Sequence, residues 1–229
     1  GQTGRRTKLK YATQWSLHPR EIISFLFPYH FGLQNTSNLS EGAYWGFMPF
    51  TQSTHYVGLV ALIFAILGVT LKRPERYEKI FWAITILTII TGFGSFFSVL
   101  YKPFYLFLPF FSKFRIPSMI YILLAITIPI LASKGLDTFL EVYEDAHKRK
   151  YIFYILGSLL VLSLSFFLVG DLFFSFSTSG DLRYDPVTIS KIRSARIDLF
   201  NKGLILAISI CVCIISLTYG LIQKQIDSP

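Results

Sequence analysis

The sequence predicts an all-α, polytopic helical membrane protein with about five transmembrane helices and additional short interfacial helices. Of its 229 residues, 52% are hydrophobic and only 15% are charged, whereas about 25% of the residues in a soluble domain are charged. The apolar residues form long blocks separated by short charged loops, and they do not alternate with polar residues as they would in strands. Blocks of this length are typical of helices that cross a bilayer.

Five apolar blocks give the predicted spans of a helical bundle over residues 54–222. The blocks are 54–71, 80–99, 117–133, 151–170 and 203–222. The third is the clearest, because the eighteen residues 116–133 carry no charge, and this length is enough to cross a hydrocarbon core. Gly92 and Gly94 near the end of the second block predict a break in the helix or the close approach of another helix.

Residues 1–53 contain no apolar block long enough to span and are predicted to form an outer-face loop. A short helix is expected over 21–27, because Pro19 suits the start of a helix and Pro28 ends it. Its apolar residues are too few to cross a membrane and too many to leave in water. We therefore expect this helix to lie in the membrane interface.

Basic residues set the predicted orientation. The short loop 72–79 has four Lys or Arg residues among its eight, and short basic loops stay in the cytoplasm. Loop 134–150 is expected on the same side, whereas 1–53, 100–116 and 171–202 are expected outside. The net charge of +9 then reflects topology signals and contacts with lipid headgroups, and does not indicate nucleic-acid binding.

The cysteines and histidines predict neither a disulfide nor a metal site. Cys211 and Cys213 lie two residues apart in an apolar block, where they face different sides of a helix. The four histidines are scattered along the chain without the spacing of metal ligands, and neutral interfacial histidines are the simpler interpretation. No cofactor motif occurs. The chain starts without methionine, so we expect it to be a piece of a longer protein.

Charged residues on the predicted outer face are the candidates for chemistry. Lys113 and Arg115 follow an aromatic run and stand at the mouth of the third span. A guanidinium at this depth requires phosphate, carboxylate or water as a partner, and its planar fork matches phosphate oxygens. The alternative is that Arg115 only snorkels to lipid headgroups. A cavity beside this site is expected to be lined from segment 1–53 by His18, Arg20, Glu21, Tyr44 and Trp45.

The predicted outer loop 171–202 adds further charges, which in such loops are ordinarily solvated. They include Asp171, Asp181, Arg183, Asp185, Lys191, Arg193, Arg196 and Asp198. Cations for a phosphate and carboxylates for an acceptor hydroxyl are thus both present, as a membrane enzyme acting on a lipid-linked phosphate would need.

Five short motifs follow one another over about residues 13–140: SLHPREIISFLFPYHFG, YWGFMPF, HYVGLVALIFAILG, FRIPSM and LASKGLD. In this order and spacing they resemble the bacterial YfhO-like membrane protein family. That family is similar to C-type glycosyltransferases, which take a sugar from a polyprenyl-phosphate donor on the outer face of the membrane. The resemblance implies that the chain is a fragment from the C-terminal part of the spanning region of such an enzyme.

The resemblance also implies the substrates and the location. The donor would be a polyprenyl-phosphate-linked sugar, and the acceptor an envelope glycopolymer or lipid at the bacterial cell membrane. Lys113 and Arg115 would hold the donor phosphate where the aromatic run receives the lipid tail. Enzymes of this type carry an acidic catalytic motif in a first outer loop, which the chain lacks, so the catalytic base stays unassigned. The alternative is a lipid or polymer transporter, or a membrane assembly subunit, whose outer charges only steer substrates.

Overall fold

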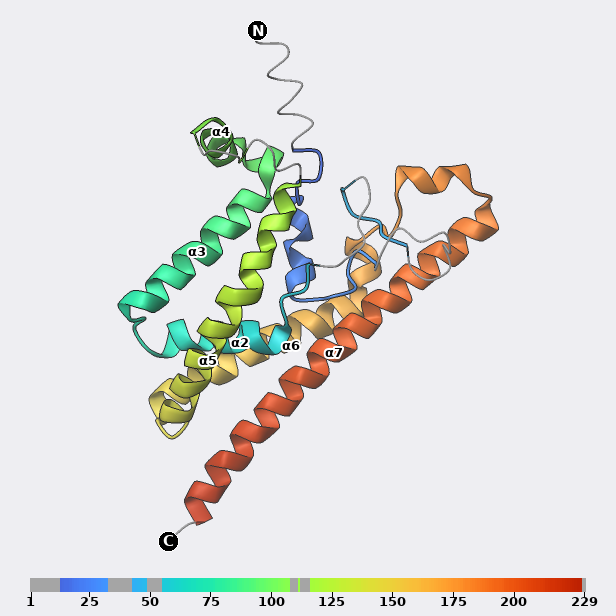
Figure 1. The fold of residues 1–229 in the computed structure, drawn as a ribbon. Coiled ribbons are helices and arrows are strands. Elements are labelled where there is room, and N and C mark those ends of the chain that lie inside the picture. The colour runs from blue at the N-terminus through green and yellow to red at the C-terminus, as the bar shows by residue number, and fades with distance from the viewer. Residues whose placement is uncertain (1–12, 33–42, 49–54, 108–110, 112–115, 228–229) are drawn as a thin grey trace.

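The computed structural model describes residues 13–32, 43–48, 55–107, 111 and 116–227. Across these residues the chain forms helices and turns and no strand, which confirms the all-α class (Figure 1). The α-helices are α2 (Leu59–Leu71), α3 (Arg76–Gly92), α4 (Ser98–Phe107), α5 (Leu124–Val142), α6 (Ala146–Phe173) and α7 (Pro186–Asp227). The short 3₁₀ helices are η1 (Pro19–Phe25), η3 (Gly94–Phe97), η5 (Pro117–Leu123) and η6 (Ser179–Arg183).

Three helical stretches in the described part of the chain are long and apolar enough to cross a membrane, whereas five were expected. They are Pro117–Val142, Ala146–Phe173 and Pro186–Lys224. The predicted first span becomes a helix only at Leu59, after Gly58 with its φ of 87°, so α2 has 13 residues. Such a helix is about 20 Å long, shorter than a hydrocarbon core of about 30 Å. The predicted second span is α3, which has 17 residues and begins with a charged turn.

Two segments predicted as outer loops contain helices. The predicted loop 100–116 includes most of α4, and the predicted loop 171–202 includes the first part of α7. Pro186 is the first residue of α7, and Asp185 accepts a hydrogen bond from the Thr188 amide at 2.9 Å. The charges of 191–198 suggested a loop, but they lie on a helix that extends beyond the apolar block.

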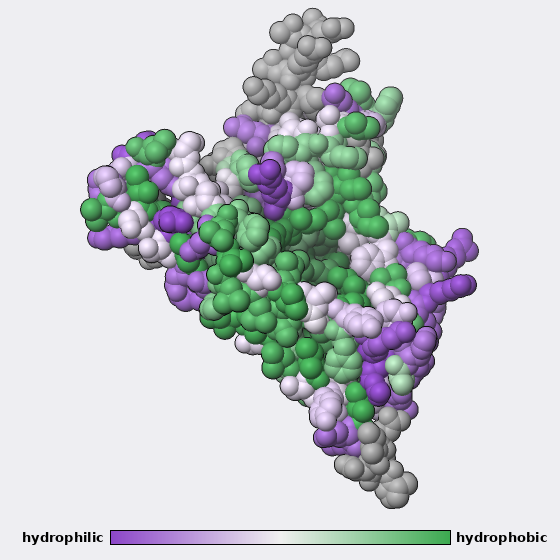
Figure 2. All heavy atoms as spheres, turned by 180° about the vertical axis from the view of Figure 1, so that it is seen from behind, coloured by the Kyte–Doolittle hydropathy of each residue, from purple (hydrophilic) through white to green (hydrophobic). Residues whose placement is uncertain are grey.

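The helices α6 and α7 each bury a stripe of residues spaced alternately four and three apart. The stripe of α6 is Ile152, Leu156, Leu159, Ser163, Phe166 and Gly170, and that of α7 is Phe200, Leu204, Ala207, Cys211, Ile214 and Thr218. This spacing is typical of helices that pack at a shallow angle. Other faces of both helices carry exposed apolar side chains, and Figure 2 shows a broad apolar surface between hydrophilic patches. The exposed apolar surface is consistent with a membrane protein.

The helices α2 and α5 cross in backbone contact at two glycines. A Cβ on Gly135 would overlap the carbonyl oxygen of Phe64, and a Cβ on Gly68 would lie 2.9 Å from the Cα of Gly135. Close approach through small residues is a common way for membrane helices to associate. Two turns earlier in α5, the Thr85 hydroxyl on α3 donates to the Thr127 hydroxyl at 2.9 Å. Helix α5 thus contacts both α2 and α3.

The residues before η1 are attached to the end of α3. The Leu17 amide donates to the Gly92 carbonyl at 3.1 Å, and the Ser95 amide donates to the Ser16 hydroxyl at 2.9 Å. Gly94 has a φ of 47°, and a Cβ there would overlap the Ser16 hydroxyl. The helix break and the close approach predicted from these glycines are therefore both present.

The helix expected in the membrane interface over 21–27 is instead the buried η1. Glu21, Ser24 and Phe25 are buried, and among the large apolar side chains of η1 only Ile22 is exposed, at 41%. A helix in the interface plane would present its apolar face to lipid. Here that face packs on the protein, so the expectation of a surface helix is wrong.

Candidate functional site: a buried polar network beside an apolar cavity

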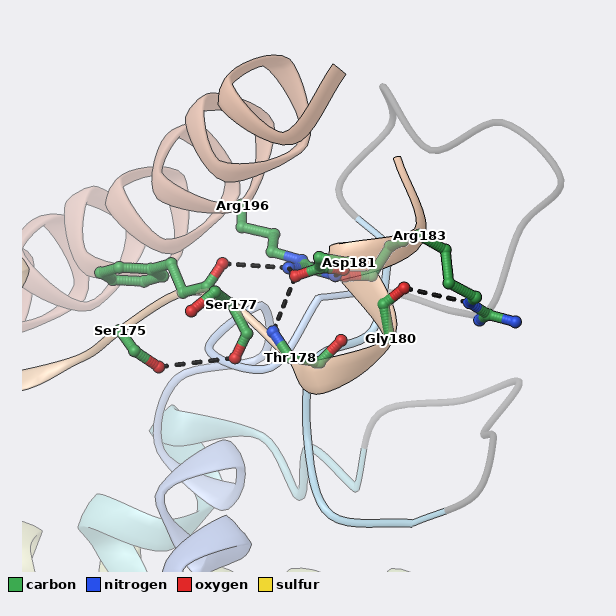
Figure 3. Close-up of polar contacts among 9 residues, drawn as sticks. Ser175, Ser177, Thr178, Gly180, Asp181, Arg183 and Arg196 are labelled. Atoms are coloured by element: carbon green, nitrogen blue, oxygen red, sulfur yellow. Dashed lines mark hydrogen bonds and ion pairs between the residues drawn. The ribbon is translucent and has the colours of Figure 1, made fainter. Parts of the chain in front are cut away.

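The Arg196 guanidinium joins the N-terminal part of α7 to two separate segments of the chain (Figure 3). Its Nε donates to the Ala43 carbonyl at 2.9 Å and its Nη1 to the Phe176 carbonyl at 3.0 Å. It also forms a bidentate ion pair with Asp181, with contacts of 2.6 and 3.1 Å. Only 2% of the Arg196 surface is exposed. Every nitrogen of this guanidinium therefore donates within the protein.

The Asp181 carboxylate is likewise occupied within the protein. Its Oδ2 accepts a second hydrogen bond, from the Thr178 amide at 2.7 Å. Burial would raise the pKa of Asp181, but hydrogen bonds from Arg196 and Thr178 outweigh burial and lower that pKa below its usual value. Nearby, Phe176 has a φ of 50°, a strained conformation for a bulky residue. Its carbonyl bond to Arg196 helps to hold this conformation.

Glu21 binds the other side of segment 43–48. Its Oε2 accepts from the Tyr44 hydroxyl at 2.8 Å, and its Oε1 accepts from the Phe47 amide at 2.9 Å. Glu21 is 2% exposed, and burial raises its pKa above the usual value, although these hydrogen bonds counteract that effect. Glu21 and Arg196 thus hold the same short segment from η1 and α7. Both buried carboxylates of this network have their oxygens engaged, which favours a structural role for them.

The residues predicted to line an outer cavity have different environments. Glu21 and Tyr44 are buried and bonded to each other. Trp45 is half-buried in an aromatic cluster, His18 packs on a phenylalanine, and Arg20 is exposed. The structure brings these residues into one neighbourhood, where they form a packed cap. They are not among the residues that line the cavity described next.

An apolar cavity of about 360 Å³ lies where α3, α4 and η5 meet. Its lining includes Tyr101, Phe111, Ile116, Pro117, Met119 and Ile122. Burial raises the pKa of Tyr101 to about 12, in keeping with apolar surroundings. Lys113 and Arg115, the predicted phosphate-binding residues, lie outside the described residues. In the sequence they lie three residues and one residue before Ile116, which lines the cavity.

Sequence reasoning missed a buried histidine enclosed by aromatic rings. His30 is 1% exposed, and its ring lies 4.5 Å from Phe31, 4.4 Å from Phe174, 4.9 Å from Phe200 and 5.5 Å from Trp45. Neither ring nitrogen has a hydrogen-bond partner, and burial lowers the pKa of His30 to about 3. His30 is neutral at pH 7, as expected, but it is buried within the protein and does not lie exposed at an interface. Its aromatic neighbours come from distant segments that no local sequence pattern connects.

We expect His30→Phe to leave stability unchanged or raise it by about 1 kcal/mol at pH 7, because it removes two unpaired buried nitrogens. The stability gain of His30→Phe over the wild type should become larger at acidic pH. An unfolded chain protonates this histidine below pH 6.5, but the folded chain does so only near pH 3. Stability is therefore lost as the pH falls through this window, by about 1.4 kcal/mol per pH unit.

Unfolding of both proteins at pH 7 and pH 4.5 in detergent checks this prediction. The free energy of unfolding of His30→Phe should fall less between pH 7 and pH 4.5 than that of the wild type. Some decrease should remain, because burial also lowers the pKa of His55 to about 4. His147→Phe, at an exposed position, is the control. A variant with the same pH dependence as the wild type would contradict the prediction.

The comparisons with known proteins give no relative. No family model matches the chain, and no curated protein or solved structure matches it. The resemblance to the YfhO-like family therefore stays a prediction from the sequence motifs. In the described part of the chain, no group of His, Cys, Asp or Glu is placed to hold a metal ion. Cys211 is buried and Cys213 is exposed, so they face different sides of α7, as expected.

Proposed function

We propose that the chain is the membrane-embedded part of a bacterial glycosyltransferase that binds a polyprenyl-phosphate-linked sugar. The apolar cavity between α3, α4 and η5 carries this proposal. It would receive part of the polyprenyl tail, while Lys113 and Arg115 would bind the donor phosphate. The sugar would pass to a glycopolymer or lipid of the cell envelope, with the protein surrounded by membrane lipids.

Chemistry and sequence position both support this assignment. The cavity lining is almost entirely apolar and includes Ile116, the residue directly after Arg115. A polyprenyl phosphate has the same division, with an apolar tail and an anionic head. A charge-assisted bond from a guanidinium to the head would contribute roughly 1.5–3 kcal/mol, and each buried methylene of the tail about 0.8 kcal/mol.

A transporter or assembly subunit is the second candidate, and one observation favours it. The two buried carboxylates of the polar network, Glu21 and Asp181, are fully occupied by hydrogen bonds. Neither is poised to accept a proton from an acceptor hydroxyl, as a general base must be. In this alternative the same cavity binds the lipid, but no sugar is transferred.

Ile122→Trp should weaken binding of a photoreactive polyprenyl phosphate about tenfold, because the indole fills the cavity and displaces apolar contacts worth about two methylenes. The measurement is photolabelling of the protein in lipid nanodiscs over a range of probe concentrations. Ile126→Trp is the matched control, since Ile126 is also exposed on the same helical stretch and does not line the cavity. An equal loss of affinity for the probe in both variants would contradict lipid binding in the cavity.

Incubating the full-length protein with a glycosylated polyprenyl phosphate separates the two functions. Release of the unglycosylated carrier lipid supports sugar transfer. Movement of the intact donor across a vesicle bilayer supports the transporter.

A further inference from the structure

An exposed aromatic platform lies on the same end of the molecule as the polar network. The His18 ring stacks on Phe47, with 3.8 Å between the ring centroids and 18° between the planes, and meets Phe96 edge-on at 4.6 Å. Phe47 is 51% exposed and Phe96 is 50% exposed. We call these three rings the aromatic platform.

Hydrogen bonds fix the aromatic platform from beneath. The Phe47 amide donates to the buried carboxylate of Glu21, and Nδ1 of His18 accepts from the Arg20 amide at 3.1 Å. Phe96 belongs to η3, whose Ser95 amide is held by the Ser16 hydroxyl. Rings immobilised in this way lose little conformational entropy when a ligand stacks on them.

The edge of the platform can form hydrogen bonds. Because Nδ1 of His18 already accepts a hydrogen bond, a neutral ring carries its proton on Nε2 as a donor. Arg20 is exposed beside it and forms no ion pair with any described residue. Because His18 is stacked against one face of Phe47, the ring face left free for a ligand is the outer face of Phe47. A surface that served only to contact acyl chains would not need the Arg20 guanidinium, whereas an exposed aromatic face with a donor beside it suits an amphiphilic ring.

The platform and the apolar cavity belong to neighbouring stretches of the chain. In the sequence, Phe96 in η3 lies between Thr91 at the end of α3 and Tyr101 in α4, and both of these residues line the cavity. The proposal below places the polar part of a cavity-bound ligand at the platform.

We propose that the exposed face of Phe47 in the aromatic platform binds the pyranose ring of the lipid-linked donor, with the Arg20 guanidinium donating to its hydroxyl groups. This inference rests on the proposed function and assigns the sugar subsite to residues outside the lipid cavity. The C–H face of a pyranose carries partial positive charge and is attracted to the negative face of an aromatic ring.

The test compares two ligands, a polyprenyl phosphate and the same lipid carrying one hexose, for the protein in zwitterionic nanodiscs. Wild-type protein should bind the glycosylated lipid more tightly. Phe47→Ala should remove roughly a threefold to tenfold part of this preference and leave the affinity for the bare lipid unchanged. The substitution keeps the backbone amide that binds Glu21. Phe107→Ala, at a position 83% exposed on α4, is the matched control and should keep the preference.

The outcomes separate this inference from the proposed function. If Phe47→Ala weakens both ligands equally, the platform is a membrane anchor and the sugar subsite is refuted. If Phe47→Ala keeps the full wild-type preference for the glycosylated lipid, the sugar subsite is also refuted, but lipid binding in the cavity is not. If the wild type binds neither ligand, both proposals fail.

Discussion

Arg196→Ala is expected to lower the free energy of unfolding by about 3–5 kcal/mol, because it leaves the Asp181 charge buried without its partner. The Ala43 and Phe176 carbonyls lose their donor in the same step. The two segments around Ala43 and around Phe176 to Asp181 would then lose their common attachment to α7. The loss should be measured by unfolding in mixed detergent micelles, where the folded fraction is followed by circular dichroism.

Lys202→Ala provides the control for a lost ion pair on the same helix. Lys202 binds Asp198 at 2.7 Å, but both side chains are more than 60% exposed, so the loss should stay below about 1 kcal/mol. Replacing both partners, as in Arg196→Met with Asp181→Leu, should recover part of the stability, since no charge then stays buried. An Arg196→Ala protein within 1 kcal/mol of the wild type would show that this ion pair does not hold the cap together.

Gly135→Ala should destabilise the protein by about 3 kcal/mol or more, at the upper end of overpacking effects. The added methyl would overlap the Phe64 carbonyl of α2, and a backbone atom cannot rotate away as a side chain does. The two helices would have to separate, with loss of packing along their whole crossing. The higher helix propensity of alanine returns only about 1 kcal/mol.

Gly157→Ala on α6 is the matched control for Gly135→Ala, because a Cβ at Gly157 meets nothing within 4 Å. It should leave stability unchanged or raise it by up to about 1 kcal/mol. Thermal unfolding of the two variants in one detergent gives the comparison. Similar melting temperatures for both would argue against the tight crossing of α2 and α5.

Local patterns in the sequence predicted the helical class and the positions of the long apolar helices. They failed for 171–202, because the charged residues there were assigned to a loop. The charges of 191–198 lie on α7, which begins at Pro186. The buried stripe that identifies the helix is uninterrupted by charge only from Phe200 onward, so apolar content alone placed the start of the helix too late. The predicted number of five spans was also counted from apolar content alone. Apolar content does not reveal that α2 starts only after Gly58 and has 13 residues.

The candidate site was less accessible to sequence reasoning. Glu21 and the charges of 171–202 were named as candidates, yet nothing local in the sequence pairs Arg196 with Asp181 or Glu21 with Tyr44. The second pair is 23 residues apart, and its contact depends on how η1 packs. A histidine in an aromatic enclosure gives no sequence signal, since its neighbours come from segments brought together only by the fold.

The unbroken helix α7 links two distant ends of the molecule mechanically. It runs from Pro186 to Asp227 without interruption in Figure 1, and its part after Arg196 is about 46 Å long at 1.5 Å per residue. Arg196, near the start of this helix, binds segment 43–48 of the packed cap. A continuous helix tilts as one body. A displacement of the cap would therefore tilt α7 about the part that packs on α6 and move its C-terminal end.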